Sequence, residues 1–189
     1  AYGDDDKGDD SGSAYIFEKL PVSLTSDDPS EATVPGMVTI PWGQSTAVFP
    51  VDAVDDAVLD GTQAVTITAS AAGYADAVAA LDVLDKERAG IRVAETNGAT
   101  VVSETGTTDT FTVVLTAQPE GDVTIAITGG DDGEAVVAPT ILKFTTADWN
   151  QPQTVNVTGV DDFVVDGDQN TPIAIAVDDA SLDAQFKAF

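Results

Sequence analysis

One pattern of ten residues occurs twice in this chain of 189 residues. Val54–Gln63 is VDDAVLDGTQ and Val160–Gln169 is VDDFVVDGDQ, so both follow V-D-D-x-V-x-D-G-x-Q. Before each copy the chain has, in the same order, a strand-like run, an acidic turn, a Val-Pro region, a tryptophan (Trp42 or Trp149) and a second strand-like run. Repetition of a whole series of features is typical of tandem copies of one folding unit. The sequence therefore predicts two domains of the same fold.

Short apolar alternations separated by Gly, Pro, Asp and Asn follow one another along the chain, and the apolar residues are mostly Val, Ala and Ile. This pattern favours strands and predicts an all-β chain of β-sandwiches. No segment keeps a helical period over helix length, and the Ala-rich Ser70–Ala80 is predicted to be a loop and a strand. The expected strands are Val22–Thr25, Met37–Ile40, Ala47–Val51, Ala64–Ala69, Ala77–Val83, Ile91–Val93, Val101–Val102, Phe111–Leu115, Val123–Ile127, Ile141–Phe144, Gln153–Val157 and Ile173–Val177.

The strongest domain boundary is the charged segment DKERAG, Asp85–Gly90, which separates two strand-rich regions. The first residues, AYGDDDKGDDSGSAYIFEK, differ from the rest and predict one short strand behind a polar turn. We therefore expect an N-terminal segment at 1–19, a first sandwich at 20–88 and a second at 89–189.

The chain is strongly acidic, with 33 Asp and Glu against 7 Lys and Arg and a formal net charge of −26. Nucleic acid is excluded as a partner because binding it requires clustered positive charge, and an anionic membrane surface would repel the chain. Divalent cations are the partners that such a surface attracts. A halophilic or marine protein kept soluble by charge is the alternative, but it predicts evenly scattered acids, whereas many of these are clustered.

The chain has no Cys and no His. Thiolate zinc sites, imidazole ligands, disulfides and Ser-His or Cys-His nucleophiles are thereby excluded. No apolar run is long enough for a transmembrane helix, so no membrane insertion is expected. The sequence starts without Met or a signal peptide, and we expect a mature or excised piece of a longer protein.

Three carboxylates on one short loop repel each other, by roughly 4 kcal/mol for two charges about 4 Å apart at an effective dielectric near 20. A hard divalent cation removes that cost, and Ca²⁺ accepts six to eight oxygens in irregular geometry, whereas Mg²⁺ needs a tighter octahedron. The loops do not have EF-hand spacing. A solvated hairpin turn is the alternative, because Asp60-Gly61 and Asp166-Gly167 also suit a turn with positive φ.

Residues 20–189 resemble two tandem Calx-β modules, both incomplete. The resemblance is carried by VVSETGTTDTFTVVLTAQPEGDVTIAITGGDDGEAVVAPTILKFTTADWNQPQTVNVTGVDDFVVDGDQ in the second and by LPVSLTSDDPSEATVPGMVTIPWGQSTAVFPVDAVDDAVLDGTQAVTITASAAGYADAVAALDVLDKE in the first. It implies immunoglobulin-like sandwiches that bind calcium at one tip. The first copy lacks the opening strands of the family and their acid, and the second ends before the closing strand and its acidic run.

The resemblance also implies which residues bind calcium. In the first module they are Asp27, Asp28, Asp55, Asp56, Asp60, Asp85 and Glu87. In the second they are Glu104, Asp131, Asp132, Asp161, Asp162 and Asp166.

The N-terminal AYGDDDKGDDSGSAYIF resembles the end of an FG-GAP repeat, the unit of integrin-type β-propellers. The loops of that family can bind calcium, which implies a weak cation site at Asp4, Asp6 and Asp9. A solvated acidic loop is the alternative.

An enzyme is not expected. Acid–base chemistry on a sugar needs two carboxylates in different environments within a cleft, and Trp42 and Trp149 give little support for one. Lys143 alternates with Leu142 and Phe144 and is expected to face solvent.

The first functional hypothesis is an extracellular or cell-surface, calcium-stiffened structural or adhesive module. The second is a filament subunit whose open sheet edges pair with another chain, and the third is a receptor-binding adhesin.

Overall fold

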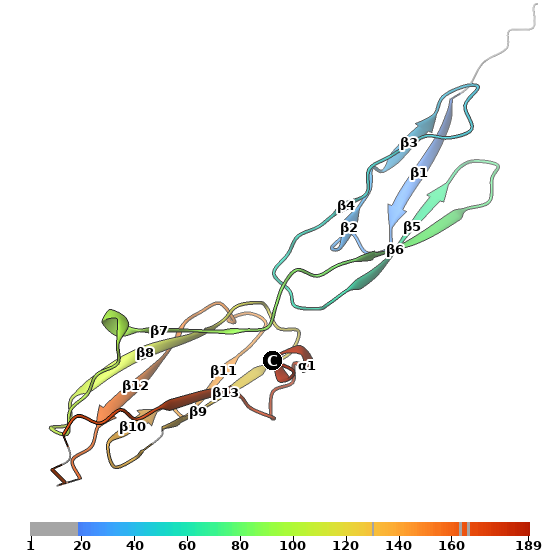
Figure 1. Ribbon diagram of the computed structural model, residues 1–189. Helices are drawn as coiled ribbons and strands as arrows, with labels where there is room; N and C mark the ends of the chain where they lie inside the picture. Colours follow the sequence, from blue (N-terminus) through green and yellow to red (C-terminus); the bar gives the residue numbers. More distant parts are fainter. Residues whose placement is uncertain (1–18, 130, 163, 166) are drawn as a thin grey trace, which may run out of the picture. The chain divides into compact units, whose positions relative to one another are not determined.

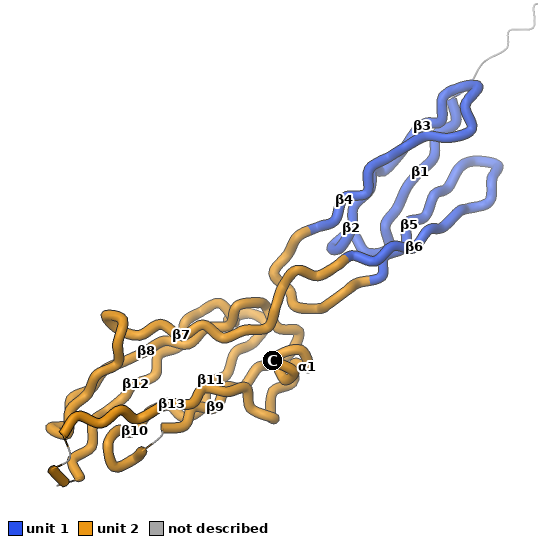
Figure 2. Tube along the Cα trace, in the orientation of Figure 1, with its two compact units in different colours: residues 1–54, 64–83 blue, residues 55–63, 84–189 orange. Residues whose placement is uncertain are grey.

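The computed structural model describes residues 19–129, 131–162, 164–165 and 167–189 (Figure 1). These divide into two compact units (Figure 2). Unit 1 contains residues 19–54 and 64–83, and unit 2 contains residues 55–63 and those described from 84 to 189. The chain thus passes between the units after Val54, after Gln63 and after Val83. The predicted first sandwich included 55–63 and 84–88, whereas contacts group both segments with unit 2. The predicted segment 1–19 lies outside the described residues, apart from Lys19.

Unit 1 contains a four-stranded sheet, β3-β1-β5-β6, and a two-stranded sheet, β2-β4. β1 is antiparallel to both β3 and β5, and β2 is antiparallel to β4. Val65 and Ile67 on β5 and Ala32 on β2 are buried between the two sheets together with Val83 on β6. The strands are β1 (Leu20–Ser26), β2 (Ala32–Thr33), β3 (Met37–Ile40), β4 (Asp52–Ala53), β5 (Gln63–Ser70) and β6 (Ala77–Val83).

Unit 2 is built from a four-stranded sheet, β10-β12-β8-β7, and a three-stranded sheet, β11-β9-β13. Its elements are β7 (Ile91–Glu95), the 3-10 turn η1 (Thr96–Gly98), β8 (Thr108–Leu115), β9 (Val123–Gly129), β10 (Ala135–Ala138), β11 (Ile141–Phe144), β12 (Gln153–Gly159), β13 (Ile173–Val177) and α1 (Ala184–Lys187).

Alternation along the strands of unit 2 explains its core. On β9 every second side chain, Val123, Ile125 and Ile127, is buried, and Val155 and Val157 repeat the pattern on β12. A period of two places these side chains on one face of each sheet, where they pack in a single cluster. The prediction of an all-β fold is confirmed, because the only α-helix among the described residues has four residues.

Two predicted strands are wrong. Ala47–Val51 is not a strand, and Val48 is 95% exposed. The neighbouring β4 pairs only with the two-residue β2, so this alternation has no sheet to join. Val101–Val102 is also not a strand, because the N–H of Val101 donates to the Asp109 carboxylate at 2.9 Å instead of to a neighbouring strand.

Five short elements were not predicted: β2, β4, η1, β10 and α1. The helix begins at Asp183, whose Oδ1 accepts the N–H groups of Gln185 and Phe186, each at 2.9 Å. Its Oδ2 accepts the N–H of Glu120 at 2.8 Å. Phe186 is fully buried in the core of unit 2, so a single apolar anchor and one cap hold a helix too short to show a period.

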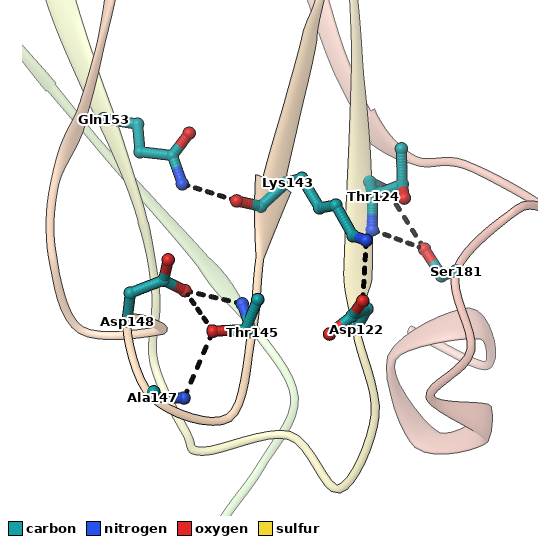
Figure 3. A network of polar contacts seen from close by, with 8 residues as sticks. All are labelled: Asp122, Thr124, Lys143, Thr145, Ala147, Asp148, Gln153 and Ser181. Atoms are coloured by element: carbon teal, nitrogen blue, oxygen red, sulfur yellow. Dashed lines mark hydrogen bonds and ion pairs between the residues drawn. The ribbon is translucent and has the colours of Figure 1, made fainter.

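Lys143 faces solvent as predicted, with 61% of its side chain exposed. Its Nζ lies 2.7 Å from Asp122 Oδ2, between β11 and the start of β9 (Figure 3). Within the described part of the chain, no helix has the length and apolar character needed to cross a membrane.

Candidate cation-binding loops

The two acidic turns that follow β1 and β9 have the same backbone geometry. In unit 1, Asp28 O accepts the N–H of Ala32 at 3.1 Å, and Asp28 Oδ1 accepts the N–H of Ser30 at 3.1 Å. In unit 2, Asp131 O accepts the N–H of Ala135 at 3.0 Å, and Asp131 Oδ1 accepts the N–H of Gly133 at 2.9 Å. The two turns are therefore equivalent, with Asp28 corresponding to Asp131.

The Val-Asp-Asp loops are also equivalent. Asp56 Oδ1 accepts the N–H of Val58, and Asp162 Oδ1 accepts the N–H of Val164, both at 2.8 Å. Such turns, in which an aspartate binds a backbone N–H two residues on, explain one Asp in each copy without a metal. The glycines that follow in the pattern have φ values of 78° and 76° (Gly61 and Gly167), as the turn alternative expects.

The turn and the loop of each copy are joined by one backbone hydrogen bond. Val54 N–H donates to Glu31 O at 2.7 Å, and Val160 N–H donates to Glu134 O at 2.9 Å. Each glutamate stands three residues after the equivalent aspartate, Asp28 or Asp131. The prediction missed these glutamates, although the shared D-x-x-E spacing is visible in both copies.

In unit 2, Asp85 and Glu87 lie close to the loop 55–63. Asp85 Oδ2 accepts the N–H of Gly61 at 2.9 Å, and Asp85 Oδ1 accepts the N–H of Glu87 at 2.6 Å. Lys86 Nζ binds the Asp55 carboxylate, 2.7 Å from Oδ2, and both side chains are about two-thirds exposed. Carboxylates from the middle and from the end of the predicted first module thus meet in one group, together with a lysine that the prediction did not include.

The carboxylates of this group perturb each other. The pKa of Glu87 is raised by partial burial, by the side-chain hydrogen bond with Asp85 and by the charge of Asp85. Burial acts to raise the pKa of Asp85 as well, but the N–H groups of Glu87 and Gly61 outweigh it and the pKa is lowered. The Asp55 carboxylate raises the pKa of Lys86. The group therefore carries crowded negative charge that one ammonium offsets in part.

The loop 55–63 is held in unit 2 by Leu59. Its side chain is 3% exposed and belongs to the core cluster of that unit. Its N–H donates to Gln118 O at 2.8 Å, and its carbonyl accepts Gln185 Nε2 at 2.9 Å. Gln118 N–H donates in return to Ala57 O at 2.7 Å. Leu59, which stands between the second Val and the third Asp of the repeated pattern, thus anchors the first copy in the core. Sequence reasoning missed this role.

Unit 2 has a depression of about 710 Å³. Of the residues predicted for the second site, Glu104 lines it, together with Glu134 and Asp168, which were not among the predicted residues. Asp131, Asp132, Asp161 and Asp162 do not line it. Asp166, and the weak N-terminal site of Asp4, Asp6 and Asp9, lie outside the described residues.

The predicted residues of the first module belong to different units. Asp27 and Asp28 are in unit 1, and Asp55, Asp56, Asp60, Asp85 and Glu87 are in unit 2. Asp27 Oδ1 accepts the N–H of Thr66 at 2.7 Å, which lowers the pKa of Asp27. Throughout the described ranges, no three Asp, Glu, His or Cys side chains are arranged to hold a metal ion. The donor chemistry of the loops, carboxylate and carbonyl oxygen, fits a hard cation such as Ca²⁺ and no softer metal.

A scan against protein-family models found no match, and a search of the curated proteins found none either. The resemblances to Calx-β modules and to an FG-GAP repeat therefore stay predictions.

Proposed function

We propose that this chain is a calcium-binding structural or adhesive β-sandwich module of an extracellular or cell-surface protein. The observation that carries the proposal is the duplicated pair of acidic loops. Both copies tie an aspartate turn to a Val-Asp-Asp loop through the same backbone hydrogen bond, at Val54 and at Val160. Bound calcium would neutralise the carboxylates of these loops.

The crowded group of unit 2 supports the proposal. Partial burial and the neighbouring Asp85 raise the pKa of Glu87, so negative charge is crowded there, and a divalent cation would relieve that repulsion. Asp55 and Asp85 present hard oxygen donors on the same group, and the exposed Lys86 ammonium is easily displaced because surface ion pairs contribute at most about 1 kcal/mol. The net charge of −26 raises the local concentration of any cation.

Thermal unfolding with calcium and with chelator tests the proposal. A ligand at 100 times its dissociation constant stabilises the folded state by about 2.7 kcal/mol, so we expect calcium to raise the Tm by several degrees. The double variant Asp55→Asn/Asp85→Asn keeps the hydrogen-bond acceptors and removes two charges. We expect this variant to lose most of the calcium-dependent rise in the Tm of unit 2, which the emission of Trp149 measures.

Asp76→Asn is the matched control for one such charge change, because Asp76 is exposed in the turn before β6 and outside both pairs of loops. It should keep the full response to calcium. A wild-type Tm that is the same in calcium and in chelator would contradict the proposal.

A filament subunit is the second candidate function. The observation that favours it is an open sheet edge in unit 2. Among the described residues, the sheet β11-β9-β13 ends at β13, whereas β5 of unit 1, which follows the first copy of the repeated pattern, has β6 as a further neighbour. Unpaired strand edges invite pairing with another chain.

A further inference from the structure

The two units contain the same three-strand arrangement. Unit 1 has the order β3-β1-β5 and unit 2 has β11-β9-β13, and all of these pairs are antiparallel. The repeated ten-residue pattern runs directly into β5 in the first copy and lies just before β13 in the second, so β5 and β13 are equivalent. In unit 1, β6 pairs beside β5, but no described strand pairs with the corresponding edge of β13. Unit 2 therefore has a place for one more strand.

Backbone geometry shows which groups face this edge. Ile127 N–H donates to Thr140 O, on the β11 side of β9, and Ile175 stands opposite Ile127. Asp178 N–H donates to Thr124 O on β9. Because the direction of backbone groups alternates along an antiparallel strand, Ile175 and its odd-numbered neighbours on β13 present N–H and C=O to the open edge. These are the groups that a further strand would pair with.

Beside this edge lies a groove of about 490 Å³ that both apolar and polar side chains line. Ile173 and Ile175 line one side, Val93 of the edge strand β7 lines the other, and Phe111 and Val157 lie between them. Thr171 also lines the groove, and its hydroxyl is shielded from solvent with no hydrogen-bond partner among the described residues. Polar side chains, Glu95 and Asn170 among them, line the rest of the groove. A groove with an apolar part beside free backbone groups and an unpaired hydroxyl is a surface that a β-strand can cover.

The chain contains a segment suited to this place. Ala14-Tyr15-Ile16-Phe17 is apolar on both faces, as are the first four residues of β6, Ala77–Ala80. Only two residues separate Phe17 from β1 in the sequence, so the reach of the segment from the start of β1 is at most about 20 Å, counted from Ala14. Within unit 1, β1 runs antiparallel to β5, so Leu20 lies at the opposite end of the sheet from Gln63, next to which the chain passes to unit 2. A segment tethered at that end of unit 1 is suited to pair with the groove in unit 2 of another molecule.

We propose that residues 14–19 of one copy add a strand to the free edge of β13 in a second copy, with Tyr15 and Phe17 or Ala14 and Ile16 facing the groove. This contact joins different surfaces of the two molecules, so it repeats head to tail and builds an open chain of copies. The inference rests on the filament function proposed above and names its donor and acceptor. It is independent of whether the acidic loops bind calcium.

Disulfide trapping in the full chain tests this contact, because the wild type contains no Cys. Phe17→Cys is mixed with a second protein of different mass that carries Val93→Cys in the groove, where Val93 is 43% exposed. We expect a mixed disulfide dimer, at least tenfold more abundant than with Val48→Cys, a control whose side chain is 95% exposed in unit 1. Val101→Cys, also in the groove and 71% exposed, is a second acceptor if Val93→Cys folds poorly.

The chain with both Phe17→Cys and Val93→Cys identifies the source of the strand. A ladder of disulfide-linked oligomers supports donation between copies, whereas a cyclised monomer overturns it in favour of the chain's own segment. If Val93→Cys gives no more mixed disulfide dimer than Val48→Cys, the proposed contact is overturned. This result is also the one expected if the groove holds another peptide or a small apolar ligand.

Sedimentation of the full chain separates this donor from filament formation in general. We expect Tyr15→Asp/Phe17→Asp to reduce oligomers at least tenfold and the charge-matched Ser11→Asp/Gly12→Asp to leave them unchanged. Oligomers that persist in Tyr15→Asp/Phe17→Asp would keep the filament function and overturn this segment as its donor. A monomeric wild type would overturn both, and a calcium-dependent rise in Tm would survive either result.

Discussion

Several aspartates of this chain hold a loop closed by accepting a backbone N–H. Asp148 is a clear case, because its Oδ1 accepts both the N–H of Thr145 at 2.6 Å and the hydroxyl of Thr145 at 2.8 Å (Figure 3). These bonds favour the ionised carboxylate and lower the pKa of Asp148. Bonds from the N–H groups of Val101 and Thr110 lower the pKa of Asp109 in the same way. At the scale of single residues, charge and turn geometry are therefore coupled.

This coupling predicts the pH dependence of unit 2. A carboxyl whose folded pKa lies below its value of 3.8 in the unfolded chain stabilises the fold above that pH, and the contribution is lost as the pH falls through the folded pKa. Asp148→Asn should therefore lower the free energy of unfolding by up to about 1 kcal/mol at pH 7, and by less below about pH 4. Urea unfolding at both pH values measures this. Asp179→Asn, an exposed change of the same charge, is the control, and a loss that is equal at both pH values would contradict the argument.

At the scale of elements, the loop 55–63 links the candidate site to the core of unit 2. Leu59 is the only residue of this loop in the buried cluster, which also contains Phe111, Val155 and Phe186. Asp60 and Gly61 follow Leu59 directly, and the N–H of Gly61 donates to the Asp85 carboxylate. Packing of one leucine thus fixes the position of the carboxylates on both of its sides.

We expect Leu59→Ala to destabilise unit 2 by about 2–5 kcal/mol, because a buried leucine is replaced by a cavity. Each unit contains one tryptophan, Trp42 in unit 1 and Trp149 in unit 2, so in a Trp42→Phe background the emission of Trp149 follows unit 2 alone. Val48→Ala, at an exposed position of unit 1, should change the free energy of unfolding of unit 2 by less than about 0.5 kcal/mol. Equal stability of the Leu59→Ala and Val48→Ala proteins would contradict the role of this anchor.

The sequence allowed the long strands to be predicted because their alternation is regular, as on β9 and β12. It did not reveal β2 or β4, since two residues cannot show a period, or β10, whose sequence Ala-Val-Val-Ala does not alternate. It also did not show that the loop 55–63 belongs to unit 2. Alternation at Ala47–Val51 misled the prediction because pairing depends on a neighbouring strand that local sequence does not encode. For the site, the repeated loops were visible in the sequence, but Lys86 as the partner of Asp55 depends on contacts between distant segments.

At the scale of the whole molecule, the net charge of −26 opposes folding through self-repulsion. Raising NaCl from about 0.02 M to 0.5 M shortens the screening length below about 10 Å and should raise the Tm of both units. Calcium chloride at matched ionic strength should raise the Tm further if the loops bind the ion specifically, whereas equal rises would favour a surface whose acids serve only solubility. A Tm that falls with NaCl would contradict the role of self-repulsion.

The path of the chain between the units limits how the protein can evolve. A domain that is entered and left once can be copied or exchanged by recombination at two points. Unit 2 takes Leu59 from a segment that lies between two parts of unit 1, so a gene fragment beginning after Val83 would encode its sheets without this piece of its core. The two units are therefore expected to be inherited and duplicated as a pair.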